Sequence, residues 1–106
     1  MTLILKILFA IHLGIATNFA GHDDPGNPCP YAPCIHRDLR DSDLGVAHKT
    51  LPCLTKVFIY NPRTGRSIIA KVIDRGPKIA DFDLNIAVTR KLRANGAEPI
   101  IWMVVP

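Results

Sequence analysis

The sequence predicts a small, mostly β domain with one short helix. Two strand-like runs, at residues 55–61 and 67–73, are separated by a turn that contains Pro62 and Gly65. A nearly continuous apolar run follows at residues 98–105, and the clearest helical periodicity lies between the second run and the third. With 106 residues, the chain holds at most one domain.

The first 20 residues differ from the rest and are typical of a secretory signal peptide. Lys6 stands near the start, and an apolar run extends from Ile7 to Ala16. This run falls short of the roughly 20 apolar residues that a bilayer span needs. We expect cleavage after Ala16 or Ala20, and a product that is exported to the periplasm or the extracellular space without a stable membrane anchor. An uncleaved anchor is the alternative.

Residues 21–43 are predicted to form an irregular arm rich in Cys, Pro, Gly and Asp. In a small exported protein, two of the three cysteines should pair and help to stabilise the core. The sequence leaves all three pairings open. We favour Cys34–Cys53, which would tie the arm to the first strand, because Cys29–Cys34 would close only a small loop. A zinc site is the weaker alternative, since the chain has no Cys-x-x-Cys pair and its histidines are scattered.

The two strand-like runs predict a β-hairpin. The first run holds four consecutive β-branched or aromatic residues: Val57, Phe58, Ile59 and Tyr60. Residues of these types favour strands, and the intervening segment NPRTGR has the composition of a turn.

One amphipathic helix is predicted after this hairpin. Three apolar residues recur at a spacing of four, which places them on one helical face: Leu84, Val88 and Leu92. Gly96 is a natural stop, and Asp83 or Asn85 would cap the start. The run at residues 98–105 then predicts a strand buried on both faces, at the centre of the sheet or barrel.

The charge pattern argues against nucleic-acid binding. The formal net charge is +4, but the basic residues are dispersed and the one tight group, Arg90, Lys91 and Arg93, is typical of a solvated helix face. Aromatic residues do not alternate with these charges, as they do in many nucleic-acid sites. A mild positive charge on an exported protein suits an anionic polymer such as the bacterial cell wall.

Three motifs in order resemble the rare lipoprotein A (RlpA) family. They are LGVAHKTLPC at residues 44–53, NPRTGRSIIAKVIDRGP at 61–77 and DFDLN at 81–85. The resemblance covers roughly residues 44–95, about half of the chain. It implies a six-stranded double-psi β-barrel with one or two short helices, here at residues 44–106, and a more distant likeness to expansins.

The resemblance also implies an activity, septal lytic transglycosylation of peptidoglycan. Asp74 in DRGP matches the family's catalytic acid, and His48 in VAHKTLP matches its functional histidine. Asp83 in FDL matches a barrel aspartate that acts as the acid in distantly similar endoglucanases. We therefore expect Asp74, His48 and Asp83 to form the catalytic set.

We expect substrate-binding roles for Arg75, beside the acid, for Lys49, beside the histidine, and for Tyr31, a candidate stacking ring in the arm. Two of the departures from the family pattern concern the N-terminal part of the barrel and the residue before the first predicted strand. An aromatic Trp-Tyr-Gly segment usually begins the family barrel, whereas only the Cys-rich arm takes that place here, so we expect the first strand to be irregular or missing. Leu54 stands where the family has glycine.

A lytic transglycosylase needs one well-placed acid. The C6 hydroxyl of the muramic acid attacks the anomeric carbon from within the substrate, which leaves a 1,6-anhydro end. One group can then act first as acid and afterwards as base. No cofactor or metal is implied, and we expect a monomer whose partner is the glycan strand.

Two other functions remain open from the sequence. An expansin-like protein would bind wall polysaccharide in the same groove without cutting it. A hydrolase would use Asp74 and Asp83 as a carboxyl pair, about 5 Å apart for retaining chemistry or about 6.5–9.5 Å apart for inverting chemistry.

Each candidate residue also has a purely structural interpretation. Asp74 would open a β-turn in which Gly76 supplies the backbone freedom. Asp83 would serve as the helix N-cap, and His48 would be a surface residue. Trp102 is expected in the core rather than on a sugar-stacking surface.

Overall fold

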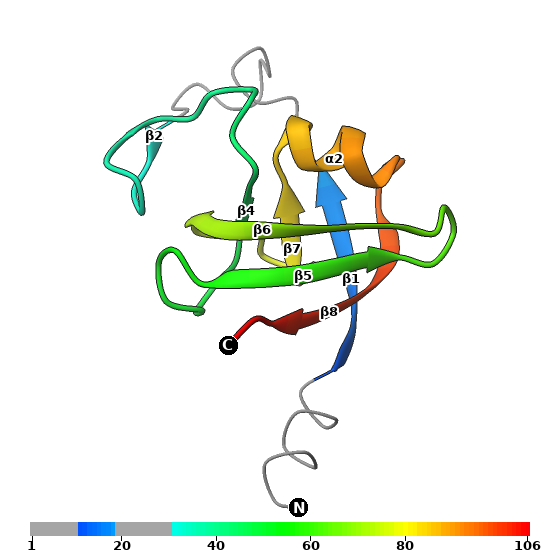
Figure 1. Ribbon diagram of the computed structural model, residues 1–106. Helices are drawn as coiled ribbons and strands as arrows, with labels where there is room; N and C mark the ends of the chain where they lie inside the picture. Colours follow the sequence, from blue (N-terminus) through cyan, green and yellow to red (C-terminus); the bar gives the residue numbers. More distant parts are fainter. Residues whose placement is uncertain (1–10, 19–30) are drawn as a thin grey trace, which may run out of the picture.

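The computed structural model describes residues 11–18 and 31–106, which form a closed six-stranded β-barrel with one short helix (Figure 1). The strand order around the barrel is β1-β7-β4-β6-β5-β8, and β2 and β3 form a separate two-stranded sheet. The predicted fold class is therefore confirmed. The elements are β1 (His12–Asn18), β2 (Tyr31–Ala32), β3 (Arg37–Asp38), β4 (Gly45–Ala47), β5 (Lys56–Asn61), β6 (Arg66–Asp74), β7 (Phe82–Leu84), α2 (Ile86–Leu92) and β8 (Glu98–Val104).

The barrel begins at β1, well before the predicted boundary at residue 44. β1 runs antiparallel to β8, with His12 opposite Trp102, and parallel to β7, with Ala16 opposite Phe82. The expectation that the first strand would be irregular or missing is therefore wrong. The segment predicted as a signal peptide overlaps this strand, while residues 1–10 and the junction at Ala20 lie outside the described residues.

The predicted hairpin is present as β5 and β6, which pair antiparallel from Lys56↔Lys71 to Asn61↔Arg66. Val57 and Ile59 are fully buried, whereas Phe58 and Tyr60 are only partly buried, so the strand shows the two-residue period of a half-buried sheet. Gly65 in the turn has φ 76°, a conformation that glycine adopts at little cost.

The helix is shorter than its sequence spacing predicts. It begins at Ile86 with Asn85 as the N-cap residue, and it ends at Leu92, before an Arg93 with φ 50°. Leu84 lies instead in β7, where it and Phe82 alternate with Asp83 and point into the core. The spacing of four does not separate a helix from a short strand followed by a helix, because both bury every member of the set.

The last strand is also different from its prediction. In β8 the buried residues Glu98, Ile100 and Trp102 alternate with more exposed ones, so the strand has one core face rather than two. Its inner face completes a core that joins the barrel to α2. The largest members of this core are Val46, Val57, Ile59, Val72, Phe82, Leu84, Val88, Leu92, Ile100 and Trp102.

A buried polar network joins β5, α2 and β8. The Asn61 side chain donates to the Leu92 carbonyl (3.1 Å) and to the Glu98 carboxylate (3.2 Å). Arg63 forms an ion pair with the same carboxylate. The hydrogen bond from Arg63 holds the pKa of Glu98 below its usual value. These hydrogen bonds give partners to buried polar groups, which would otherwise destabilise the fold.

The described part of the arm packs on the outside of the barrel (Figure 1). Ala32 and Leu39 form a second, small cluster with Ile73 of β6. Asn85 holds the following loop, because its side-chain amide donates to the carbonyls of Arg40 (3.0 Å) and Asp43 (2.6 Å). None of the helices in the described residues is both long and apolar enough to cross a membrane.

Candidate functional site

Asp74 is the last residue of β6, where the strand runs into the DRGP turn. Its carboxylate accepts a hydrogen bond from the Arg75 backbone N–H (2.7 Å), as expected of an aspartate that opens a turn. Gly76 has φ 115°, which accounts for a glycine at that position. Burial raises the pKa of Asp74, against the opposing effects of this hydrogen bond and of the Arg75 charge. The carboxyl therefore holds its proton to a higher pH than an exposed aspartate.

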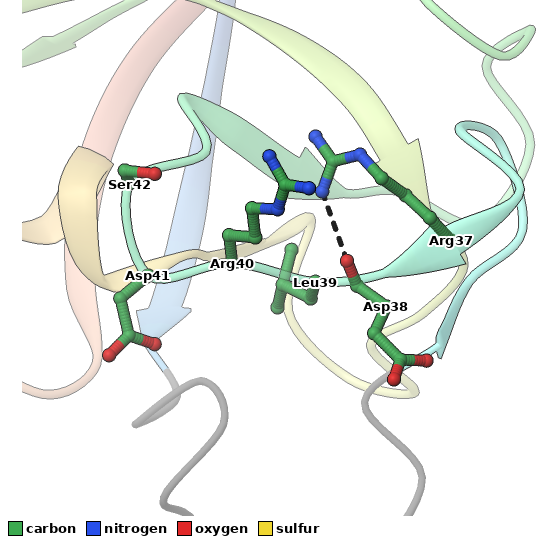
Figure 2. Close-up of a pocket in the computed structure, with 6 residues that line it drawn as sticks. All are labelled: Arg37, Asp38, Leu39, Arg40, Asp41 and Ser42. Carbon is green, nitrogen blue, oxygen red and sulfur yellow. Dashed lines mark hydrogen bonds between the residues drawn. The ribbon is translucent and has the colours of Figure 1, made fainter.

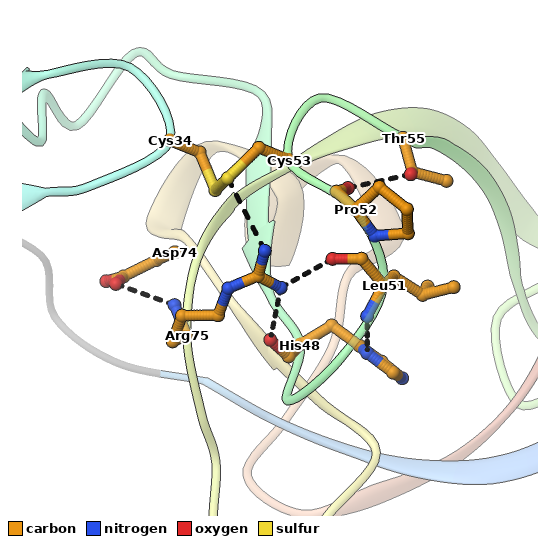
Figure 3. Close-up of a disulfide and its surroundings, with 8 residues drawn as sticks. All are labelled: Cys34, His48, Leu51, Pro52, Cys53, Thr55, Asp74 and Arg75. Carbon is orange, nitrogen blue, oxygen red and sulfur yellow. Dashed lines mark hydrogen bonds between the residues drawn. A yellow bond between two sulfur atoms is a disulfide. The ribbon is translucent and has the colours of Figure 1, made fainter.

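The guanidinium of Arg75 is turned away from that carboxyl (Figure 3). It donates to the carbonyls of His48 (3.3 Å) and Leu51 and contacts the sulfur of Cys53 (3.4 Å). In this position Arg75 ties the loop after β4 to the DRGP turn. Because the guanidinium is turned away, the Arg75 charge cancels only part of the rise in the Asp74 pKa that burial causes.

His48 is held as a neutral imidazole. Its Nδ1 accepts hydrogen bonds from the backbone N–H groups of Thr50 (3.1 Å) and Leu51 (3.0 Å), so the ring proton is assigned to Nε2. Burial lowers the pKa of His48, and the charge of Asp81 opposes that effect. The ring lies 5.0 Å from Phe82 and 5.9 Å from Trp102, between ring centroids.

His48 and Asp74 are neighbours through the backbone rather than through their side chains. The His48 N–H donates to the Asp74 carbonyl (3.1 Å). Figure 3 shows the imidazole and the carboxyl on opposite sides of the Arg75 side chain. Among the described contacts, the carboxylate charge that acts on the imidazole is that of Asp81.

Asp83 lies in β7 and is not the helix N-cap. It is the register partner of Thr17 in β1, and the Thr17 hydroxyl donates to its carboxylate (3.1 Å). Asp83 and Asp74 are both register partners of Ala47, so β4 lies between them. Two strand spacings put their Cα atoms about 10 Å apart. Thr17 was missed from the sequence because it falls in the segment predicted to be removed.

A second group that the sequence analysis missed lies where β1 meets β8. His12 stacks on Trp102, with 4.3 Å between ring centroids. The Asp81 carboxylate accepts from the Ile15 N–H (2.8 Å), and a Cβ at Gly14 would lie 2.5 Å from the same oxygen. A side chain at Gly14 would therefore displace the Asp81 carboxylate from this position. The DFD spacing is the one sequence signal that could have pointed to Asp81.

The remaining predicted binding residues are accessible to solvent. Tyr31, in β2, is 50% exposed, and Lys49 is exposed in the loop after β4. The described contacts place neither side chain against Asp74. Trp102 is buried in the core as expected, with its indole N–H unpaired among the described residues.

A disulfide joins Cys34 to Cys53, the pairing favoured from the sequence, with 5.1 Å between Cα atoms (Figure 3). It links the arm to the loop that carries His48. Cys29 lies outside the described residues. In the part of the chain that the structure describes, His, Cys, Asp and Glu form no group of three suited to a metal ion.

One surface hollow is formed by the loop that follows β3, at residues 37–42 (Figure 2). Arg37 donates to the Asp38 carbonyl there (3.0 Å) and pairs with Asp43 (2.7 Å). These side chains are bonded within the loop, and the hollow contains none of the predicted site residues.

The chain is similar to curated RlpA proteins over part of its length. It is 37% identical over 68 residues to the endolytic peptidoglycan transglycosylase RlpA of Pseudomonas aeruginosa, covering 53% of this chain and 20% of that protein. It is 42% identical over 48 residues to the probable endolytic peptidoglycan transglycosylase RlpA of Aquifex aeolicus, covering 43% and 21%. The chain thus spans about a fifth of the length of these relatives. No protein-family model matches it.

Solved structures show the same fold over most of the chain. The expansin of Clavibacter michiganensis matches with a TM-score of 0.66 at 22% identity, over 91% of this chain and 50% of that one. The Streptomyces papain inhibitor matches with a TM-score of 0.65 at 23% identity, over 91% and 94%. Taken with the sequence motifs, these likenesses show that the chain is RlpA-like over about half of its sequence and has the double-psi β-barrel fold of the expansin.

Proposed function

We propose that this protein cleaves peptidoglycan glycan strands by lytic transglycosylation, with Asp74 as the acid and then the base. The observation that carries the proposal is the state of Asp74. Its carboxyl is partly buried, its pKa is raised by that burial, and the neighbouring guanidinium is turned elsewhere. The names of the similar RlpA proteins support the same reaction.

The reaction needs Asp74 to donate one proton and then to accept another. Protonated Asp74 gives its proton to the glycosidic oxygen between MurNAc and GlcNAc while the C–O bond breaks. The Asp74 carboxylate then takes the proton from the C6 hydroxyl of the same MurNAc as that oxygen bonds to the anomeric carbon. The bond that forms closes the 1,6-anhydro ring, no water is consumed, and Asp74 returns to its protonated form.

The other predicted residues act on the sugar. Because Nδ1 of His48 is occupied by backbone donors, His48 offers its Nε2–H to a sugar hydroxyl and does not share the Asp74 proton. Asp83, held by the Thr17 hydroxyl, supplies a negative charge for the oxocarbenium-like transition state. Lys49 provides a positive charge for the anionic wall, and Tyr31 a stacking ring.

A second candidate is non-catalytic binding of wall polysaccharide, as in an expansin-like protein. It is favoured by the separation of the His48 ring from the Asp74 carboxyl and by the fold likeness to an expansin over 91% of the chain. In this case Asp74, Asp83 and Lys49 bind hydroxyl groups and charges of the polymer without proton transfer.

Digestion of purified sacculi separates these functions. We expect the protein to release fragments with anhydro-muramic ends, identified by mass spectrometry. Asp74→Asn should lower the release rate about 10²- to 10⁴-fold, the usual contribution of general acid and base catalysis. Asp41→Asn is the control, since Asp41 is an exposed residue of the loop after β3 and belongs to none of the proposed site residues. Reducing ends would support a hydrolase, and sedimentation with sacculi without release would support the binder.

The pH dependence is a second readout of the same proposal. Release should fall as pH rises through the raised pKa of Asp74, because the first step needs the protonated acid. A rate that is equal in the wild type and in Asp74→Asn at every pH would remove Asp74 from the mechanism.

The proposal includes export, since peptidoglycan lies outside the cytoplasmic membrane. Cleavage of a leader after Ala16 or Ala20 would remove all or most of β1, so the proposed activity requires residues 12–18 to remain on the exported protein.

A further inference from the structure

An aliphatic pocket of about 580 Å³ lies on the outside of the barrel, and none of the residues proposed for catalysis lines it. Its volume is within the range of sites that take small molecules or short peptide segments. Most of its lining is aliphatic: Ile35, Leu44, Leu54, Ile69, Ile73 and Val105. The polar lining consists of Arg37, Ser42, Asp43, Lys56 and Lys71. We call this site the aliphatic pocket.

The arm wall of the aliphatic pocket is held in place by covalent and polar contacts. The Cys34–Cys53 disulfide fixes the arm next to Leu54, and the Cys34 N–H donates to the Ile73 carbonyl (3.2 Å). Arg37 holds the Asp43 carboxylate with two hydrogen bonds (2.7 and 3.0 Å). The pocket is therefore formed before any ligand arrives, which lowers the cost of binding.

Leu54 lines this pocket with a strained backbone conformation. Its φ is 66°, in the left-handed region that a branched side chain rarely adopts. The backbone is held there by a hydrogen bond from the Leu54 N–H to the Val72 carbonyl (2.7 Å). The side chain is 50% exposed, so core packing does not explain leucine at a position that favours glycine. Ile69, in the same lining, is 53% exposed.

Two lysines give the aliphatic pocket a positive edge. Lys56 and Lys71 are direct cross-strand partners on β5 and β6, an arrangement of like charges that weakens a sheet. Neither has an ion-pair partner among the described residues, and the nearby carboxylate of Asp43 is already bound by Arg37. An anionic group between the two ammonium groups would remove this repulsion.

We propose that the aliphatic pocket binds the C-terminal carboxylate of a short peptide with aliphatic side chains. The Lys56 and Lys71 ammonium groups hold the carboxylate, and Leu54 and Ile69 cover the side chain of the last residue. The Ser42 hydroxyl, also in the lining, suits an N–H group of a peptide and would gain nothing from an alkyl chain. This proposal does not depend on glycan cleavage.

The probe is N-acetyl-Leu-Leu with a free carboxylate, compared with its C-terminal amide. Titration calorimetry and backbone amide NMR shifts on the full chain measure affinity and location. We expect the acid to bind at least fivefold more tightly than the amide at low salt, with shifts in β5, β6 and the loop at residues 42–44. This preference should shrink as salt is added, because it comes from exposed charges.

Leu54→Gly is the decisive variant. It relieves the positive φ, so the thermal midpoint should not fall, yet it removes the cover of the ligand side chain and should weaken binding about tenfold. The double variant Lys56→Met/Lys71→Met should bind the acid and the amide equally. Lys78→Met, an exposed lysine outside the lining, is the matched control and should behave like the wild type.

Three results would overturn the proposal. These are equal binding of the acid and the amide by the wild type, unchanged binding by Leu54→Gly, or amide shifts that map to the other face of the barrel. None of these results depends on glycan cleavage or on Asp74, so the two proposals fail separately.

Discussion

Removal of residues 1–20, the segment with the features of a signal peptide, should abolish the barrel. The deletion takes away β1, which lies between β7 and β8 and closes the six-stranded barrel. Both neighbours would become open edges with unpaired backbone groups. The Trp102 ring would also lose its stacking partner, His12.

The expected loss is comparable to the whole stability of the domain. β1 forms five register pairs with β8 and three with β7. At about one ladder hydrogen bond per pair and about 1 kcal/mol net per bond, the deletion costs about 8 kcal/mol. Small domains have about 5–15 kcal/mol in total. The truncated chain should therefore be largely unfolded in water.

Urea unfolding of two truncations measures this loss. One variant lacks residues 1–20 and the other lacks residues 1–10, which leaves all of β1 in place. Trp102 is the single tryptophan of the chain, so its fluorescence reports directly on the contact with β1. We expect a cooperative transition and a blue-shifted emission only in the variant that retains β1.

The reasoning fails if both truncations unfold cooperatively at the same urea concentration. That result would mean that β7 and β8 pair without β1, and that a leader cleaved at Ala20 is compatible with a stable barrel.

Three further predictions concern stability. In Gly45→Ala, the new methyl group would overlap the buried side chain of Ile73, so the free energy of unfolding should fall by about 1–3 kcal/mol in urea titrations. Replacing Cys34 and Cys53 by serine should cost about 3 kcal/mol, because the bond spans 19 residues; an unchanged thermal midpoint would contradict this. Because the folded pKa of Glu98 is lowered, its contribution is present above about pH 4.3, the unfolded value, and is lost as pH falls through the folded pKa. Glu98→Gln should flatten the pH dependence of unfolding in that acid range, and an equally steep dependence would assign it to other groups.

The central hairpin and the disulfide could be anticipated from local sequence. β5 and β6 consist of β-branched and aromatic residues around a turn with Gly65, and neighbouring residues alone favour that structure. Cys34–Cys53 was favoured because it would connect the arm with the first predicted strand. The hairpin depends on the preferences of neighbouring residues, and the disulfide is one of only three possible cysteine pairings.

β1 could not be identified from composition alone. The sequence HLGIATN is apolar enough to serve as a signal core, and it also has the alternation of a strand with one buried face, in which Ala16 is buried and Leu13 is 83% exposed. Its partners β7 and β8 begin more than 60 residues later, and only pairing with them decides between the two interpretations.

The sequence by itself determined the type of fold, the RlpA-like motifs and the identity of the candidate acid, because these follow from local preferences and from residues in fixed order. The tertiary structure decided where the side chains point. It placed Thr17 on Asp83, turned Arg75 away from Asp74 and set the His48 ring against Phe82. Side-chain direction depends on contacts between strands far apart in the chain, and no local pattern encodes those contacts.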